Sequence, residues 1–367
     1  MSLTRRTRCL VIAAAAAAVA IVAASCSSEV AVTVSSAPTT STTAPPAPIV
    51  WPLTGLPAPD QAATQQTAVV AKIDNSSEAR PHGGINQADL VYEVQVEGIT
   101  RFAAVFHSQV PDRVGPVRSA RSTDVDLVAD LGSPILVWSG GNANVVGEVN
   151  AAASAGLLIN GGYDVASGDY QRVSGRFAPH NLFANVAAVR DGLGRPGEAF
   201  PKPLFTYRTE AAPGQRRPGT TSTTLPPSGD PVPGITISWD LGSSVTYVWD
   251  AAAGCNRRFQ DGAPFVDEAG ENVCPRNVVI QYTEYGPSTA DSRSPQAYTV
   301  GKGGGLVYTG GRLSTVLWDR PDQLSGPNLT LADLTPAQLT PGSTWVALPP
   351  PEQVVTNLSA DQASALL

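Results

Sequence analysis

Two stretches rich in Ser, Thr, Pro and Ala divide this chain and limit what it can fold into. The first covers residues 26–50 and the second residues 212–234. Neither has the apolar periodicity that builds a core, so we expect a tether first and then a flexible linker or long surface insertion. Residues 51–211 and 235–350 are each long enough for one domain, and 351–367 would form a C-terminal tail.

The N-terminal residues have the pattern of a secretory signal. Three arginines precede an apolar run from Leu10 to Ala24, which is shorter than the roughly 20 residues needed to span a bilayer. Small residues lead to Cys26, as in a bacterial lipobox. We expect residues 1–25 to be a signal peptide and Cys26 to carry a lipid that anchors the protein on the outer face of the cell membrane. The alternative is ordinary cleavage nearby, with Cys26 unmodified.

Charge and cysteine content narrow the class of protein. The chain has 24 basic and 31 acidic residues, and removal of the signal with its three arginines leaves 21 against 31, a formal charge of −10. Such a chain is not expected to bind nucleic acid over its surface. Cys255 and Cys274 remain, and in an oxidising compartment we expect a disulfide that stabilises the fold by roughly 3 kcal/mol.

The two segments differ in their predicted secondary structure. The first mixes alternating apolar runs with apolar residues at helical spacing, and its runs at 90–97 and 101–108 predict a β-hairpin with one polar face. The second has short strands separated by Gly, Asp and Asn turns. The predicted fold class is α+β, with an N-terminal mixed α/β domain followed by a smaller, mostly antiparallel β domain. Further strands are predicted over 67–74 and 134–139, and helices over 119–131 and 144–153.

Familiar catalytic motifs are missing from the sequence. It contains no GxSxG or SxxK, and no mature cysteine is free to act as a thiolate, so a serine or cysteine hydrolase is not supported. The three histidines, His82, His107 and His180, are far apart in sequence and form no HExxH pair. We therefore expect no metal site and no cofactor.

Polar residues gather where the predicted strands end and the 119–131 helix begins. Such positions are where functional sites are built on a rigid scaffold. Glu93 and Glu97 are predicted to share one face of a strand, and Glu97 and Arg101 flank its turn. The set comprises Asp74, Asn75, Arg80, Glu93, Glu97, Thr100, Arg101, Arg118, Ser119 and Arg121.

The arginines near the predicted helix start require an anion. If the helix begins near Ser119, the helix dipole disfavours Arg118 and Arg121 there, whereas an anion at the same place is favoured. That anion could be a ligand, or a carboxylate of the protein such as Asp124, three residues beyond Arg121. The sequence leaves both alternatives open.

Three strings carry a resemblance to a known family. EGITR (residues 97–101), GPVRSAR (115–121) and APHNLF (178–183) resemble the YerB family of bacterial lipoproteins, and the second segment from RRFQDG to PGSTWVALP is similar to that family's C-terminal domain. The resemblance implies a membrane-anchored, extracytoplasmic two-domain protein connected with the cell envelope and without a settled activity. It adds His180 and Asn181 to the candidate site.

We predict a binding or accessory protein of the bacterial cell envelope. Its first domain would hold an anionic ligand, such as a cell-wall fragment, between arginines and His180, because a guanidinium pairs in two-pronged fashion with carboxylate or phosphate. The predicted ligand-binding residues are Asn75, Arg80, Thr100, Arg101, Arg118, Ser119, Arg121, His180 and Asn181.

Two alternatives come from other classes of protein. One is a hydrolase of an envelope polymer, in which Asp74, Glu93 or Glu97 is the general acid or base and His180 carries protons. The other is a structural or interaction module, in which the charged residues form a buried ion network and an envelope protein is the partner.

Overall fold

The computed structural model describes residues 48–209, 227–239 and 242–367. The predicted signal peptide, Cys26 and most of both Ser/Thr/Pro-rich stretches lie outside the described residues. Residues Ala47–Leu367 form one compact unit. Within the described part of the chain, no helix is long and apolar enough to cross a membrane.

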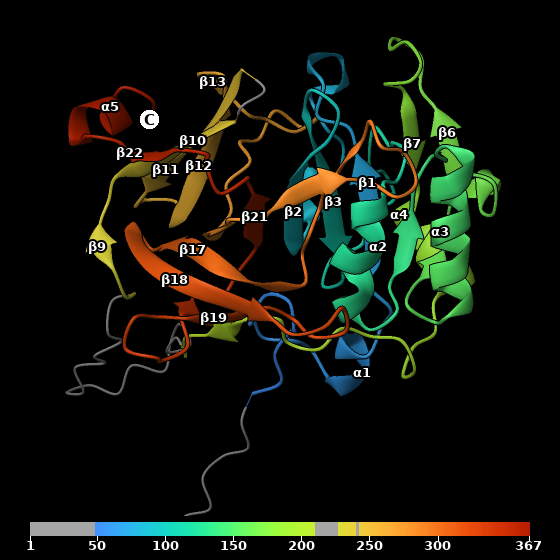
Figure 1. The fold of residues 1–367 in the computed structure, drawn as a ribbon, viewed down its shortest axis with the longest axis horizontal. Coiled ribbons are helices and arrows are strands. Elements are labelled where there is room, and N and C mark those ends of the chain that lie inside the picture. The colour runs from blue at the N-terminus through green and yellow to red at the C-terminus, as the bar shows by residue number, and fades with distance from the viewer. Residues whose placement is uncertain (1–47, 210–226, 240–241) are drawn as a thin grey trace, which may run out of the picture. The chain divides into compact units, whose positions relative to one another are not determined.

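One large mixed sheet takes strands from both sequence segments (Figure 1). The first segment supplies β1 (Val69–Ile73), β2 (Leu90–Gln95), β3 (Thr100–Phe106), β4 (Ile135–Val137) and β5 (Ile159–Asn160). The second supplies β9 (Asp230–Pro231), β14 (Asn277–Gln281), β17 (Gly301–Thr309), β18 (Arg312–Arg320), β19 (Asn328–Thr330) and β21 (Thr344–Leu348). The order is β19-β18-β17-β14-β21-β2-β3-β1-β4-β5, and β9 pairs with β18.

The two segments meet where β2 runs parallel to β21, with Leu90 opposite Thr344. On its other side β2 forms the predicted antiparallel hairpin with β3. Gly98 in the turn has φ +73°, a conformation that glycine adopts without strain. The prediction of one polar face on this hairpin is wrong in one respect. All of β2 except Gln95 is buried, because a second sheet covers the side that carries Glu93.

This second sheet is antiparallel, as predicted for the C-terminal region, and has the order β13-β12-β11-β10-β22. Its strands are β10 (Gly234–Trp239), β11 (Ser243–Asp250), β12 (Cys255–Gln260), β13 (Ala263–Pro264) and β22 (Val355–Asn357), and the short helix α5 (Ala360–Ser364) packs on it. The predicted disulfide is confirmed: Cys255 in β12 and Cys274 are bonded, with their Cα atoms 5.4 Å apart.

Two apolar cores lie on the two faces of the large sheet. Alternate residues of β1 point to opposite sides, Val70 into one core and Val69 into the other. The first core is covered by α2 (Ser122–Val128) and α3 (Ala143–Ser154), and the second by α4 (Val186–Leu193) and the second sheet. The fold is therefore a mixed α+β fold that is mostly β in its C-terminal region, as predicted.

The remaining elements are short. They are α1 (Gln61–Thr64), β6 (Tyr170–Arg172), β7 (Leu182–Ala184), β8 (Thr206–Tyr207), β15 (Tyr285–Pro287), β16 (Pro295–Ala297), β20 (Gln338–Leu339) and four 3₁₀ turns, η1 (Ser77–Ala79), η2 (Ile85–Gln87), η3 (Ala129–Leu131) and η4 (Ser167–Asp169).

Candidate functional site

Asp74 and Arg118 are brought together by two segments that run side by side. The backbone N–H of Asp74 donates to Pro116 O at 3.0 Å, and that of Arg118 donates to Lys72 O at 2.8 Å. The Nε atom of Arg118 then lies 3.2 Å from Oδ2 of Asp74. This ion pair is not aligned as a hydrogen bond, so the Arg118 guanidinium makes no hydrogen bond with the described residues.

His180 reaches the same carboxylate from the loop between β6 and β7. Its Nδ1 atom lies 2.7 Å from Oδ2 of Asp74 and 3.0 Å from Oγ of Ser76. In a Ser-His-Asp triad, the serine contacts one ring nitrogen of the histidine and the carboxylate contacts the other. Here Ser76 and Asp74 both contact Nδ1 of His180, so the three residues are not arranged as such a triad. Within the described part of the chain, Nε2 makes no hydrogen bond and is free to meet a ligand.

The Asp74 carboxylate is fully buried but stays an acid of low pKa. Burial by itself would raise its pKa. The hydrogen bond from the Ser76 N–H at 3.1 Å and the charges of Arg118 and His180 outweigh burial and lower the pKa below its ordinary value. Asp74 is therefore an anion that orients its neighbours rather than a proton donor near neutral pH.

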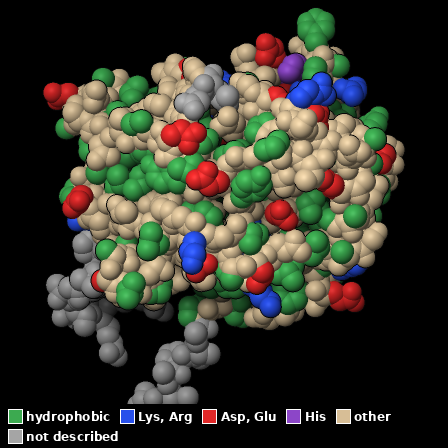
Figure 2. Space-filling view, viewed as in Figure 1, with side chains coloured by type: hydrophobic (Ala, Val, Ile, Leu, Met, Phe, Trp, Pro, Cys, Tyr) green, Lys and Arg blue, Asp and Glu red, His purple; other side chains and the backbone are tan. Residues whose placement is uncertain are grey.

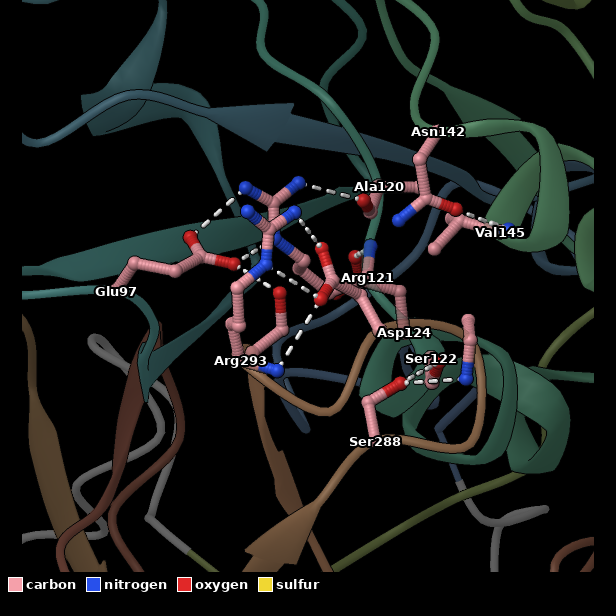
Figure 3. A network of polar contacts seen from close by, with 12 residues as sticks. Glu97, Ala120, Arg121, Ser122, Asp124, Asn142, Val145, Ser288 and Arg293 are labelled. Atoms are coloured by element: carbon pink, nitrogen blue, oxygen red, sulfur yellow. Dashed lines mark hydrogen bonds and ion pairs between the residues drawn. The ribbon is translucent and has the colours of Figure 1, made fainter.

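Arg121 lies at the start of α2 and is paired within the protein (Figure 3). Its Nε and Nη2 atoms donate to the two oxygens of Glu97 at 2.7 and 2.8 Å. Burial opposes ionisation of Glu97, but hydrogen bonds from Arg121 and Ser294 lower its pKa to about 2. The helix begins at Ser122 rather than near Ser119, so the residues up to Arg121 precede it.

Asp124 has a different role from the predicted one. Its Oδ2 atom accepts the backbone N–H of Arg121 at 2.7 Å, which caps α2. Its Oδ1 atom lies 2.6 Å from Nζ of Lys72, and both side chains are fully buried. The carboxylate that pairs with the Arg121 side chain is that of Glu97 and not that of Asp124.

Arg101 is the one arginine of this cluster without a partner among the described residues. Its side chain is 6 % exposed, and its Nε and Nη1 atoms are sealed from solvent without a hydrogen bond. No described carboxylate forms an ion pair with it. Burial, together with the charges of Arg121 and Arg118, lowers the pKa of Arg101 to about 10, so it remains a cation at neutral pH.

The cluster therefore has an excess of positive charge. Arg101, Arg118 and Arg121 share two carboxylates, Asp74 and Glu97, in a protein whose overall charge is negative. On the face drawn in Figure 2, basic and acidic side chains lie close together beside a histidine at the upper right, whereas the side chains of Arg101, Arg118 and Arg121 are largely buried. An excess cation held beside a histidine is suited to binding an anion.

The other predicted residues form a second network, on the opposite face of the β2–β3 hairpin. Asn75 Nδ2 donates to Thr100 Oγ1 at 2.8 Å, and Thr100 donates to Glu93 at 2.8 Å. Glu93 is buried against Arg258 of β12, with Nη2 at 3.1 and 3.2 Å from its oxygens. The same nitrogen donates to Gln260 at 2.9 Å.

This second network corrects the prediction that Glu93 and Glu97 share one face of a strand. Glu93 points toward the second sheet, whereas Glu97 lies beyond the end of β2 and pairs with Arg121. Sequence reasoning missed Arg258 and Gln260, although the alternation in CNRRFQ places both on one face of a strand.

Three further predicted residues lie around the edge of these networks. Arg80 donates from Nη2 to the backbone oxygen of Asn75 at 2.9 Å. Asn181 accepts from Arg172 at 2.8 Å and donates to the Arg176 oxygen at 3.3 Å, so it holds the loop that carries His180. The Ser119 side chain makes no hydrogen bond with the described residues.

The described residues contain no group of three or more His, Cys, Asp or Glu side chains that could hold a metal ion. His82 is fully buried and its Nε2 atom lies 2.6 Å from the backbone oxygen of Asp74, while His107 contacts Gln66 O at 3.0 Å. Burial lowers the pKa of these two histidines to about 3 and about 4, which keeps both neutral. They are part of the scaffold around Asp74 and β3.

Comparison with known proteins shows which protein family the chain belongs to. Residues 53–198 match the family model described as the N-terminal domain of a protein of unknown function (DUF3048), and residues 235–346 match its C-terminal domain. The chain belongs to the DUF3048 family.

One curated relative and one solved structure are similar over most of their length. The relative is named "Putative lipoprotein YerB" from Bacillus subtilis (strain 168); it is 28 % identical over 309 residues, which cover 82 % of this chain and 86 % of the relative. The crystal structure of the YerB protein from Bacillus subtilis matches with a TM-score of 0.68 and 25 % identity, over 84 % of this chain and 99 % of that one.

Proposed function

We propose that this protein is a lipid-anchored, extracytoplasmic binding protein of the bacterial cell envelope whose first segment holds an anionic ligand on Arg101 and Arg118. His180 presents its Nε2 atom to the same ligand. Arg121 belongs to the edge of the site, because its guanidinium is already paired with Glu97.

The observation that carries the proposal is the unpaired, buried guanidinium of Arg101. A buried cation without a partner costs several kcal/mol, about as much as breaking a buried ion pair. A protein under selection for stability alone would not keep it, whereas an incoming carboxylate or phosphate would satisfy it. The ion network of the structural alternative accounts for Arg118 and Arg121 but leaves Arg101 unexplained.

The pairing of carboxylates required for glycan hydrolysis finds no support here. Glu93 is enclosed with Arg258, and Glu97 has a pKa of about 2, so neither is poised as a general acid.

One observation favours a hydrolase that works by another mechanism. It is the Asp74–His180 pair, in which Nε2 of His180 makes no hydrogen bond with the described residues. Loss of envelope-polymer turnover in His180→Gln would support it; the absence of turnover by the native protein would exclude it.

The anchor is proposed at Cys26. The support is the predicted signal peptide in residues 1–25 and the name of the Bacillus subtilis relative, which describes that protein as a lipoprotein. Radiolabelled palmitate supplied to expressing cells should label the native protein and not Cys26→Ser, and the variant should leave the membrane fraction. Equal labelling of the two proteins would contradict the anchor.

The anion site is tested by titrating the full mature chain with inorganic phosphate and with purified envelope fragments. Arg101→Gln and Arg118→Gln should each weaken binding by about tenfold or more, since a hydrogen bond to a charged group is worth about 1.5–3 kcal/mol. The matched control is Arg195→Gln, because Arg195 is exposed and its side chain forms no ion pair with the described residues. Native-like binding by both site variants, or no binding by the native protein, would overturn the proposal.

A further inference from the structure

A groove opens between the helices α2 and α3, which lie side by side in Figure 1. It has a volume of about 400 Å³, which is within the range of known ligand pockets. Its wall includes Asp126 of α2, Glu148 of α3 and Gln296 of β16, so both sequence segments contribute to it. The arginines of the cluster are not part of this wall, and the groove is therefore separate from the proposed anion site.

One side of the groove is an apolar face of α3. Glu148, Ala151, Ala152 and Ala155 follow one another at spacings of three or four residues, so the groove runs along this helix for about two turns, or about 10 Å. Ala151 and Ala155 are exposed, and alanine has no side-chain atom beyond Cβ that could fill the groove. An elongated apolar surface of this kind suits an unbranched chain of methylene groups.

Polar atoms without a partner lie on the same wall. The carboxylate of Asp126 makes no hydrogen bond and no ion pair with the described residues, and both of its oxygens are open to solvent. The side-chain amide of Gln296 is likewise open to solvent and without a hydrogen bond in the described part of the chain. The groove thus offers three oxygen acceptors to an incoming donor.

Negative charge is in excess at the groove. Burial and the nearby charge of Glu148 raise the pKa of Asp126, and the charge of Arg320 offsets them only in part. The nitrogen atoms of Arg320 donate instead to main-chain oxygens, including that of Asp126 at 2.7 Å, and to Thr299. A cation bound beside Asp126 would relieve this excess.

These features define a ligand with a positive charge at the end of an apolar chain. A lysine side chain has this chemistry, because its methylene groups lie along apolar surface while its ammonium group supplies three donors. The groove is longer than one such side chain, so the residues on either side of the lysine also fit. This favours a peptide over a small free amine.

We propose that the groove between α2 and α3 binds a lysine side chain of a basic partner peptide. The ammonium group lies between Asp126 and Gln296, within the field of Glu148, and the methylene groups lie on Ala151 and Ala155. The negative charge of the whole chain adds long-range attraction for such a partner. This site goes beyond the proposed anion site and does not depend on it.

The first test is a calorimetric titration of the full mature chain with two capped pentapeptides, which have lysine or norleucine between pairs of alanines. The lysine peptide should bind about tenfold more tightly, the gain expected from about one net hydrogen bond to a charged group. Butylammonium chloride should bind more weakly than the lysine peptide. Equal affinities for the two peptides would overturn the proposal, and so would butylammonium binding as tightly as the lysine peptide.

Two variants locate the charge preference. Asp126→Asn should remove the tenfold preference for lysine, and it should not disturb the fold because the Asp126 side chain makes no hydrogen bond with the described residues. Asp361→Asn is the matched control, since Asp361 is exposed in α5 and outside the groove wall. The control should keep the preference within about twofold. A preference that survives Asp126→Asn would mean that general charge attraction binds the peptide, and it would overturn the proposal.

A second pair of variants tests the apolar part of the groove. Ala151→Trp should fill the groove and weaken the lysine peptide by about tenfold or more, with an unchanged affinity for inorganic phosphate. Ala143→Trp is the control, because Ala143 is exposed in the same helix and outside the groove wall. Native-like peptide binding by Ala151→Trp would overturn the proposal. Loss of phosphate binding in Arg118→Gln with native-like peptide binding would show that the two sites are independent.

Discussion

Arg258 Nη2 donates to both carboxylate oxygens of Glu93, at 3.1 and 3.2 Å, although the two residues are 165 positions apart. Both side chains are buried, and the guanidinium also lies over the rings of Phe265 and Trp345. The pair joins the large sheet to the second sheet. Its formation accounts for an acidic residue in the middle of a buried central strand.

Breaking this pair on one side should be strongly destabilising. Arg258→Met leaves the Glu93 carboxylate buried without its partner, and we expect a loss of about 3–5 kcal/mol in the free energy of unfolding. The double change Glu93→Leu with Arg258→Met should recover part of that loss. Urea unfolding of the three proteins measures it, and equal losses in the single and double variants would contradict a direct interaction.

Removal of the unpaired cation should have the opposite effect on stability. Arg101→Met replaces a buried, unsatisfied guanidinium with an apolar chain of similar length, so without ligand we expect a gain of about 1–2 kcal/mol. Phosphate binding should be lost in the same variant. Arg195→Met, on an exposed arginine whose side chain forms no ion pair with the described residues, should change stability by less than about 0.5 kcal/mol. Marked destabilisation by Arg101→Met would identify Arg101 as structural.

The Glu97–Arg121 pair should make the free energy of unfolding depend on pH in the acidic range. The pKa of Glu97 is about 2 in the folded protein, below the ordinary value of 4.5. Its contribution is therefore fully present above pH 4.5 and is lost as the pH falls from 4.5 to 2. Because 36 % of the Glu97 side chain is exposed, solvent screening limits the contribution to under about 1 kcal/mol.

The variant Glu97→Gln should lose less stability than the native protein between pH 4.5 and pH 2. Urea unfolding at a series of pH values measures the difference. Glu284→Gln, at an exposed residue that forms no ion pair with the described residues, serves as the control. Parallel pH profiles for the native protein and Glu97→Gln would show that the pair contributes nothing.

The disulfide should stabilise the second sheet against unfolding. Cys255 and Cys274 are 19 residues apart, and opening a loop of this length costs roughly 3 kcal/mol on the chain-entropy model. The double change Cys255→Ser with Cys274→Ser should lower the free energy of unfolding by that amount. Addition of dithiothreitol should reproduce the loss in the native protein and leave the variant unaffected.

Local patterns predicted individual elements well. The hairpin of β2 and β3, the strand β4 and the helix α3 follow from apolar residues at spacings of two or of three to four, which depend only on neighbours in the chain. The start of α2 was predicted three residues early, because the backbone on both sides of Ser119 bonds to a distant segment instead: the Ser139 N–H donates to Arg118 O at 3.0 Å, and the Ala120 N–H donates to Gly140 O at 3.1 Å.

The sequence by itself determined the elements, the disulfide, and the fact that Arg118 and Arg121 need an anion. Only the tertiary structure decided which anion each has. Pairing between distant residues depends on strand order, and no local pattern predicts that β2 lies beside β21 and beneath β12. In that arrangement Glu93 is enclosed with Arg258 and Glu97 pairs with Arg121, while Arg101 is buried without a carboxylate partner in the part of the chain that the structure describes.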